Sequence, residues 1–266
     1  EVFIRVKFSI IILIISSVVY PSVWEELDHQ NTGYSSGIHL ISATEENITL
    51  SFKLNEVKRT NITIDGVNYL QYHTSGGSPI LERGSPDLEK WTTSIIIPDQ
   101  NKMRFEILST NYIELKNISI VPSKGNLTRN INPSDISYTF NDSYEKDIFY
   151  PGKLSELRDP YILRDFRGQV VIFYPFQYNP VSQTLRIYTE ININIQPDEE
   201  QGINPYFRTY VSNKMNTEYN SIYQNHFINF QETRYAPVGE VGKMLVISHG
   251  AFVDAMQDFV DWKNDK

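Results

Sequence analysis

The feature that most constrains the fold of this chain is an alternation of apolar and polar residues at every second position. The segment 47–57, NITLSFKLNEV, places Ile48, Leu50, Phe52 and Leu54 on one side and Thr49, Ser51 and Lys53 on the other. The segment 184–195, TLRIYTEININI, repeats the pattern with Leu185, Ile187, Ile191, Ile193 and Ile195. A period of two is typical of a β-strand with one buried face, so the chain from about residue 37 to 230 is predicted to be mainly β.

Turn residues separate these runs at 75–79 (SGGSP), 122–126 (PSKGN) and 150–152 (YPG). A second strand is predicted over GQVVIFYPF, 168–176, and a turn over QYNPVSQ, 177–183. The 17 Tyr and 14 Phe residues also favour strands over helices. Many short strands between turn signals predict an antiparallel, jelly-roll-like β-sandwich.

The last part of the chain shows a different period. A short helix near 214–225 is expected to pack on the sandwich. The continuous apolar run Met244–Ile247 predicts a strand buried on both faces, and the apolar residues from Phe252 to Val260 recur at helical spacing. One buried strand followed by one amphipathic helix is the start of an α/β domain, and no further strands follow to complete it. We therefore expect a sequence that ends inside a second domain.

The N-terminus has the charge order of a secretory signal. Arg5 and Lys7 precede an apolar run from Phe8 to Val19, which is short for a membrane span. We expect residues 1–22 to be a signal peptide, and hence a secreted or cell-surface protein that meets a membrane only during export. The first residue is Glu1 rather than Met, so this end is also expected to be incomplete.

Composition excludes several kinds of site. The chain has no cysteine, so it has neither a thiolate metal site nor a cysteine nucleophile within its 266 residues. No two of its five histidines have metal-ligand spacing. A net charge of −8 disfavours binding to nucleic acid. No catalytic residue, metal site or cofactor is therefore predicted within this segment.

Several stretches carry a resemblance to a known family. The tail RYAPVGEVGKMLVIS resembles the junction between prodomain and catalytic domain in the gingipain family of secreted cysteine endopeptidases. ILRDFRGQVV, QYNPV and TLRIYTEI are similar to the central part of an arginine-specific gingipain prodomain. The resemblance implies that 23–234 are a β-sandwich prodomain and that 235–266 begin a caspase-like catalytic domain. The full-length parent is then expected to hydrolyse peptide bonds after Arg, with its Cys, its His and any calcium ligands in the downstream catalytic domain.

The resemblance also assigns roles to three residues. The loop SKGNLTRNINP aligns with the inhibitory loop of the family, which implies that Arg129 enters the primary specificity pocket of the protease. Lys124 is the local alternative, and it would suit an enzyme that prefers lysine. The processing site of the family falls at Arg234–Tyr235, so cleavage there would remove the prodomain from its partner, the downstream catalytic domain.

A different class of protein would explain much of the same pattern. A secreted β-sandwich that acts as an adhesion or ligand-binding module accounts for the strands, the aromatics and the signal, but not for the α/β start after Arg234. Three other arginines, Arg164, Arg167 and Arg186, lie within or beside predicted strands. We interpret them as outward-facing structural residues.

Overall fold

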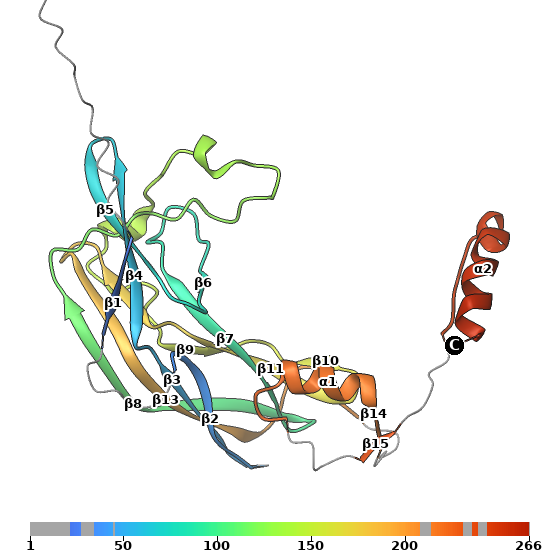
Figure 1. Ribbon diagram of the computed structural model, residues 1–266. Helices are drawn as coiled ribbons and strands as arrows, with labels where there is room; N and C mark the ends of the chain where they lie inside the picture. The colour runs from blue at the N-terminus through green and yellow to red at the C-terminus, as the bar shows by residue number, and fades with distance from the viewer. Residues whose placement is uncertain are drawn as a thin grey trace, which may run out of the picture.

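The computed structural model describes residues 22–27, 35–44, 46–207, 214–230, 236–238 and 244–265 (Figure 1). The predicted signal peptide, apart from Ser22, lies outside these residues. No helix in the described part of the chain is both long and apolar enough to cross a membrane.

Two antiparallel sheets form the body of the molecule (Figure 1). The first sheet contains β2 (Gly37–Ala43), β3 (Ile48–Lys53), β8 (Asn101–Leu115), β12 (Phe176–Asn179) and β13 (Thr184–Gln201). The second contains β6 (Ser78–Pro79), β7 (Glu89–Ile96), β9 (Ser155–Leu157), β10 (Tyr161–Leu163) and β11 (Phe166–Phe173). A smaller antiparallel sheet adds β1 (Val23–Glu26), β4 (Glu56–Ile64) and β5 (Val67–His73).

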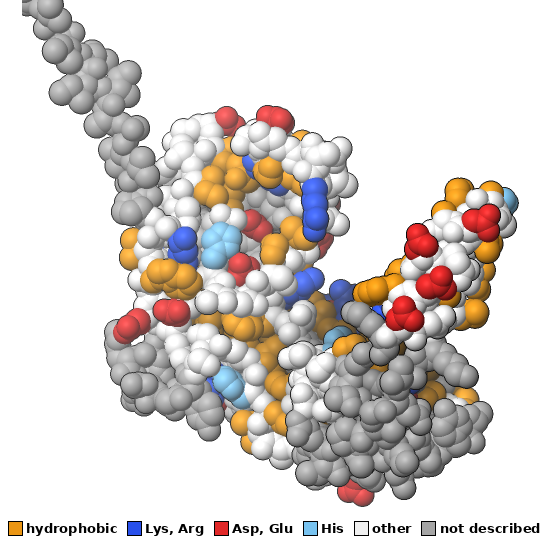
Figure 2. Space-filling view, turned by 45° about the vertical axis from the view of Figure 1, so that its right-hand side comes forward, with side chains coloured by type: hydrophobic (Ala, Val, Ile, Leu, Met, Phe, Trp, Pro, Cys, Tyr) orange, Lys and Arg blue, Asp and Glu red, His pale blue; other side chains and the backbone are white. Residues whose placement is uncertain are grey.

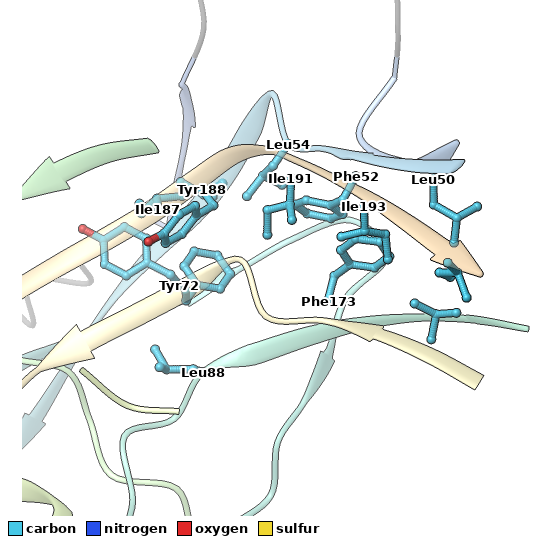
Figure 3. Close-up of a cluster of buried hydrophobic side chains, with 14 of the residues drawn as sticks. Leu50, Phe52, Leu54, Tyr72, Leu88, Phe173, Ile187, Tyr188, Ile191 and Ile193 are labelled. Carbon is cyan, nitrogen blue, oxygen red and sulfur yellow. The ribbon is translucent and has the colours of Figure 1, made fainter. Parts of the chain in front are cut away.

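The apolar faces of the two larger sheets meet in one core (Figure 3). The alternating residues of β3 and β13 are buried as predicted, and Ile191 of β13 pairs with Phe52 of β3. Phe52 stacks on Phe173 of β11 in the opposite sheet, with ring centroids 5.7 Å apart. The predicted β-sandwich is therefore confirmed.

The run 168–176 is not one strand. It divides at Tyr174 and Pro175, so that Phe173 ends β11 in one sheet and Phe176 begins β12 in the other. Residues 177–179 continue β12, and the turn to β13 is confined to 180–183. Since a proline cannot donate to a strand ladder, Pro175 allows the chain to change sheets at this point.

The predicted helix near 214–225 is α1 (Thr217–His226). It packs on the sandwich through a separate apolar cluster in which Tyr223 and Phe227 contact Phe166 of β11. The hydroxyl of Tyr223 donates to Asp165 at 2.6 Å, and burial raises the pKa of this phenol. The chain after α1 is tied to β7, because the amide of Asn229 bonds both the N–H and the C=O of Ile96.

Arg167 corrects one of our sequence predictions. It is fully buried rather than outward-facing, and its guanidinium donates to four backbone carbonyl groups at 2.6–2.9 Å, those of Pro98, Asn101, Ile203 and Asn204. A buried polar group is stable only where it is hydrogen-bonded, and here the loop after β7 and the chain after β13 supply the acceptors. Arg164 and Arg186 do reach the surface, where Arg186 pairs with Glu114 at 3.0 Å.

The expected strand at Met244–Ile247 is not formed. These residues belong to no strand, and Leu245 and Ile247 are 83% and 88% exposed. A strand of this kind needs parallel neighbours to pair its backbone groups, and the described residues provide none. The predicted helix does follow as α2 (Val253–Asn264), which buries none of its residues and shows apolar side chains on its surface (Figure 2).

Candidate functional site: the loop that carries Arg129

A long irregular connection follows β8 and ends at β9. It carries two short helical turns, Pro133–Asp135 and Asp142–Glu145, and it stands out from the end of the sandwich (Figure 1). We call residues 124–140 of this connection the Arg129 loop. Segments of this length without strands are uncommon within compact domains and often have a function.

Both ends of the Arg129 loop are held by the same tight turn, residues 82–85. At one end, Gly84 N–H donates to the carbonyl of Ser123 at 2.9 Å, and Ser123 N–H donates to the carbonyl of Ser85 at 2.8 Å. At the other end, Asn141 N–H donates to the carbonyl of Gly84 at 3.0 Å, and the Asn141 amide donates to Ser85 Oγ at 2.8 Å. The loop therefore begins and ends at one fixed point of the sandwich.

Glycine is required at position 84 of this anchor. Gly84 has a φ of +82°, in the left-handed region that side chains disfavour. A Cβ atom there would also lie 3.0 Å from Cβ of Asn141 and 3.1 Å from its backbone nitrogen. The close approach of the two backbones fixes where the loop leaves the sandwich.

Lys124 acts as an internal brace of the loop. Its Nζ donates to the carbonyl of Pro133 at 2.7 Å and lies 4.2 Å from the ring centre of Tyr138. Burial, together with the nearby carboxylate of Asp87, raises the pKa of the Tyr138 phenol. The amine of Lys124 is thus already engaged with the loop itself.

Arg129 lies in the four-residue turn Thr128–Ile131, which we call the tip of the loop. The N–H of Ile131 donates to the carbonyl of Thr128 at 3.0 Å, which places Arg129 and Asn130 at the two central positions. Arg129 is exposed, and its guanidinium has no hydrogen bond or ion pair to any described residue. A free guanidinium presents a planar set of donors that matches a carboxylate.

The sequence leaves Lys124 and Arg129 as alternatives, and the geometry distinguishes them. Lys124 is half-buried and bound within the loop, whereas Arg129 is exposed and unpaired in the described part of the chain. The sequence alone does not predict that residues 82–85 hold both ends of the loop. A Gly flanked by Arg83 and Ser85 is a general turn signal, and the contact to Asn141 exists only in the folded chain.

Arg234 and Tyr235 lie outside the described residues. The next residues, Ala236–Val238, form the short strand β15, which pairs in parallel with β14 (Lys214–Asn216). β15 includes Pro237, and proline is tolerated in a strand at the edge of a sheet. Among the described residues, no group of His, Asp and Glu could hold a metal ion.

Comparisons with known proteins agree with this architecture. The model of the Propeptide_C25 family matches residues 28–237, which is most of the sequence. The chain belongs to the Propeptide_C25 family. It is 39% identical over 237 residues to Gingipain R2 of Porphyromonas gingivalis, an alignment that covers 88% of this chain and 32% of that protein.

Other Propeptide_C25 relatives show a graded similarity. Gingipain R1 of the same organism is 38% identical over 240 residues, with 88% of this chain and 24% of that protein covered. Lys-gingipain of the same organism is 22% identical over 232 residues, with 81% of this chain and 13% of that protein covered. The chain thus spans about a third or less of the length of the curated relatives it matches.

Solved structures show the same fold. A complex of Porphyromonas gingivalis RgpB pro- and mature domains superposes with a TM-score of 0.67 at 36% identity, and 73% of this chain and 98% of that chain are covered. A structure of gingipain K from the same organism, which concerns its zymogenic latency, superposes with a TM-score of 0.57 at 18% identity, and 68% and 100% of the two chains are covered. The sandwich of this chain is therefore the fold of a gingipain-type prodomain.

Proposed function

We propose that this prodomain keeps a downstream cysteine endopeptidase latent by covering its active-site cleft and placing Arg129 in the pocket that recognises arginine. The observation that carries the proposal is the unpaired guanidinium of Arg129 at the tip of a loop whose base is fixed to the sandwich. The higher identity to the two R-type gingipains than to Lys-gingipain supports arginine as the recognised residue.

The electrostatics of such a pocket explain why an arginine is effective. A site that selects arginine must hold a partly buried carboxylate, which is unfavourable when it has no partner. A guanidinium satisfies it with two parallel charge-assisted hydrogen bonds. Because the loop is already anchored at both ends, little conformational entropy is lost when its tip enters the pocket.

The remaining roles concern the whole precursor. The downstream domain would supply a Cys thiolate that attacks the scissile carbonyl and a His that transfers protons, and the protease would cleave after arginine. Residues 1–22 would direct export. Cleavage of Arg234–Tyr235 would then release the prodomain, and a downstream enzyme with the proposed preference could perform this cleavage itself.

Latency can be tested in the full-length precursor that carries Arg234→Ala. This change should block cleavage between residues 234 and 235, so that the precursor stays intact and does not hydrolyse a small arginyl amide substrate. Adding Arg129→Ala should release activity, because the pocket then loses its occupant. The rate of substrate hydrolysis and the mass of the intact precursor give the two readouts.

Lys146→Ala in the same background is the matched control. Lys146 is an exposed lysine beyond the Arg129 loop, with no hydrogen bond or ion pair to the described residues, so this variant should stay latent. An intact Arg234→Ala precursor with the turnover of the mature enzyme would contradict the proposed latency. A wild-type mature N-terminus far from Tyr235 would contradict the processing site.

A further inference from the structure

Leu81 combines a strained backbone with an exposed apolar side chain. Its φ of +64° lies in the left-handed region, and the residue is 42% exposed. Six residues other than glycine have a positive φ in the described part of the chain, and Leu81 is the only apolar one among them. Glycine, asparagine and aspartate adopt this conformation readily, so a leucine at this position costs stability.

The neighbouring residues explain why the backbone is held in this conformation. On one side, the N–H of Ile80 donates to the carbonyl of Leu88 at 3.0 Å, which extends the pairing of β6 with β7 by one bond. On the other side, the carbonyl of Glu82 accepts from Ser85 N–H at 3.2 Å and begins the turn that anchors the Arg129 loop. Position 81 is therefore fixed from both sides, whatever residue stands there.

Packing within the prodomain does not account for the choice of leucine. Leu81 belongs to neither of the two apolar clusters formed by the described residues. Glycine or asparagine would fit the backbone at a lower cost, and an exposed apolar side chain gains little from burial in the free prodomain. Strain of this kind is found mainly where a residue serves a function.

Leu81 lies beside the base of the Arg129 loop. The turn 82–85, which follows it directly, holds both ends of that loop. A Cβ atom added at Gly125, near the start of the loop, would lie only 2.9 Å from Cβ of Arg83. The three residues 81–83 are exposed, whereas Gly84 is buried. Leu81 therefore stands on the surface from which the loop leaves the sandwich.

We infer that Leu81 is a second contact to the protease, and that it enters an apolar depression on the rim of the active-site cleft, outside the specificity pocket. The inference rests on the proposed function, because the loop that enters the pocket brings its base towards the rim. Burial of the exposed part of the leucine would offset the strain that the free prodomain carries. Because the backbone is already fixed, little conformational entropy is lost on binding.

The test compares the inhibition constants of purified chains on a mature arginine-specific gingipain. Leu81→Asn introduces a polar residue of similar size that tolerates a positive φ. We expect its melting temperature to equal or exceed that of the wild type. Its inhibition should weaken by about tenfold, because the apolar contact is lost. Leu81→Met keeps an apolar side chain of similar volume and should inhibit within about twofold of the wild type.

A double substitution separates a direct contact from an effect on the loop. If Leu81 and Arg129 touch different places on the protease, Leu81→Asn should weaken inhibition by the same factor when Arg129→Ala is already present. Ile41→Asn is the control, because Ile41 is an exposed apolar residue of β2, which lies at the far end of the sandwich from the loop (Figure 1). It should leave the inhibition constant unchanged.

Each contrary result has a separate meaning. Equal inhibition by Leu81→Asn and the wild type would overturn the inference and leave the proposed function intact. An effect of Leu81→Asn that disappears in the Arg129→Ala background would show that Leu81 acts through the loop and makes no contact of its own. A lower melting temperature for Leu81→Asn would show that the leucine stabilises the free prodomain. If Arg129→Ala leaves inhibition unchanged, the proposed function itself is wrong.

Discussion

Arg167 shows how much a single residue contributes to holding distant segments together. Its guanidinium is fully buried and joins the loop between β7 and β8 to the chain after β13 through four carbonyl groups. No carboxylate is among these acceptors. The charge is therefore stabilised by backbone dipoles, and each of them loses its partner if the side chain is shortened.

Arg167→Ala is predicted to lower the free energy of unfolding by several kcal/mol, because it leaves four carbonyl groups without this donor and each buried acceptor without a partner costs about 1–3 kcal/mol. Arg186→Ala is the matched control, since Arg186 is a partly exposed arginine whose ion pair with Glu114 should contribute about 1 kcal/mol or less. Urea denaturation of both variants measures the difference. Equal losses in the two would show that the four hydrogen bonds of Arg167 contribute no more to stability than a surface ion pair.

The hydrogen-bonded pair of His73 and Glu89 should make the stability of the fold depend on pH. His73 Nδ1 lies 2.9 Å from Oε1 of buried Glu89, and this hydrogen bond raises the pKa of His73 above its usual value of 6.5. Lys58 opposes the shift, Asp87 reinforces it, and burial lowers it. Because the folded-state pKa is raised, the stabilisation is complete below pH 6.5 and is lost as the pH rises through the raised pKa.

The neighbouring Asp87 acts in the same direction at lower pH. Burial raises its pKa while its bond to Gln71 opposes the shift, so ionisation of Asp87 also reduces stability as the pH rises. The melting temperature should therefore be lower at about pH 8.5 than at about pH 6. His73→Gln should reduce the slope of melting temperature against pH across this window. His39→Gln, on the first sheet, is the control. A slope that is unchanged in His73→Gln would contradict the role of the pair.

At the scale of elements, the strands with strong alternation could be predicted and the changes between sheets could not. β3 and β13 follow directly from their alternating apolar residues, which are buried in the core. The division of 168–176 depends on which strands pair with Phe173 and Phe176, and that pairing is set by the rest of the sandwich. Arg167 was misread for the same reason, because its acceptors come from segments far away in the sequence.

The hairpin of β4 and β5 carries its own signal in the sequence. The hairpin of β4 and β5 turns at Asp65 and Gly66, both with positive φ, and an Asp-Gly pair is a strong hairpin signal. The Arg129 loop is different. The role of Arg129 stays a prediction from the resemblance to a family, whereas the anchor at 82–85 and the hydrogen bond of Lys124 to Pro133 arise only from contacts within the folded chain.

The segment Met244–Ile247 should differ sharply from the core strands in amide hydrogen exchange. Met244–Ile247 has no strand partner among the described residues, so its amides should exchange with solvent at nearly the rate of an unfolded chain. The amides of Ile191–Ile195 in β13, which pairs with a strand on either side, should be strongly protected. Hydrogen exchange of the chain as a monomer measures both segments at once. Strong protection at Met244–Ile247 would contradict this account.

At the scale of the whole molecule, the sandwich and the Arg129 loop have separate tasks. The core and the α1 cluster give a rigid body, and the anchor at 82–85 transmits that rigidity to the base of the loop. In the proposed function, the exposed turn Thr128–Ile131 is the part of the loop that enters the specificity pocket. A change at Arg129 should therefore alter inhibition without altering the stability of the sandwich.

The inhibition constant of the purified chain on a mature arginine-specific gingipain is the most direct test of the central claim. Arg129→Ala is predicted to weaken inhibition by about 2–5 kcal/mol, or about 30-fold to several-thousand-fold, because the pocket carboxylate is left unpaired. Arg129→Lys should fall between wild type and Arg129→Ala, with equal melting temperatures for all three chains. Equal inhibition constants for wild type and Arg129→Ala would contradict the claim that Arg129 occupies the pocket.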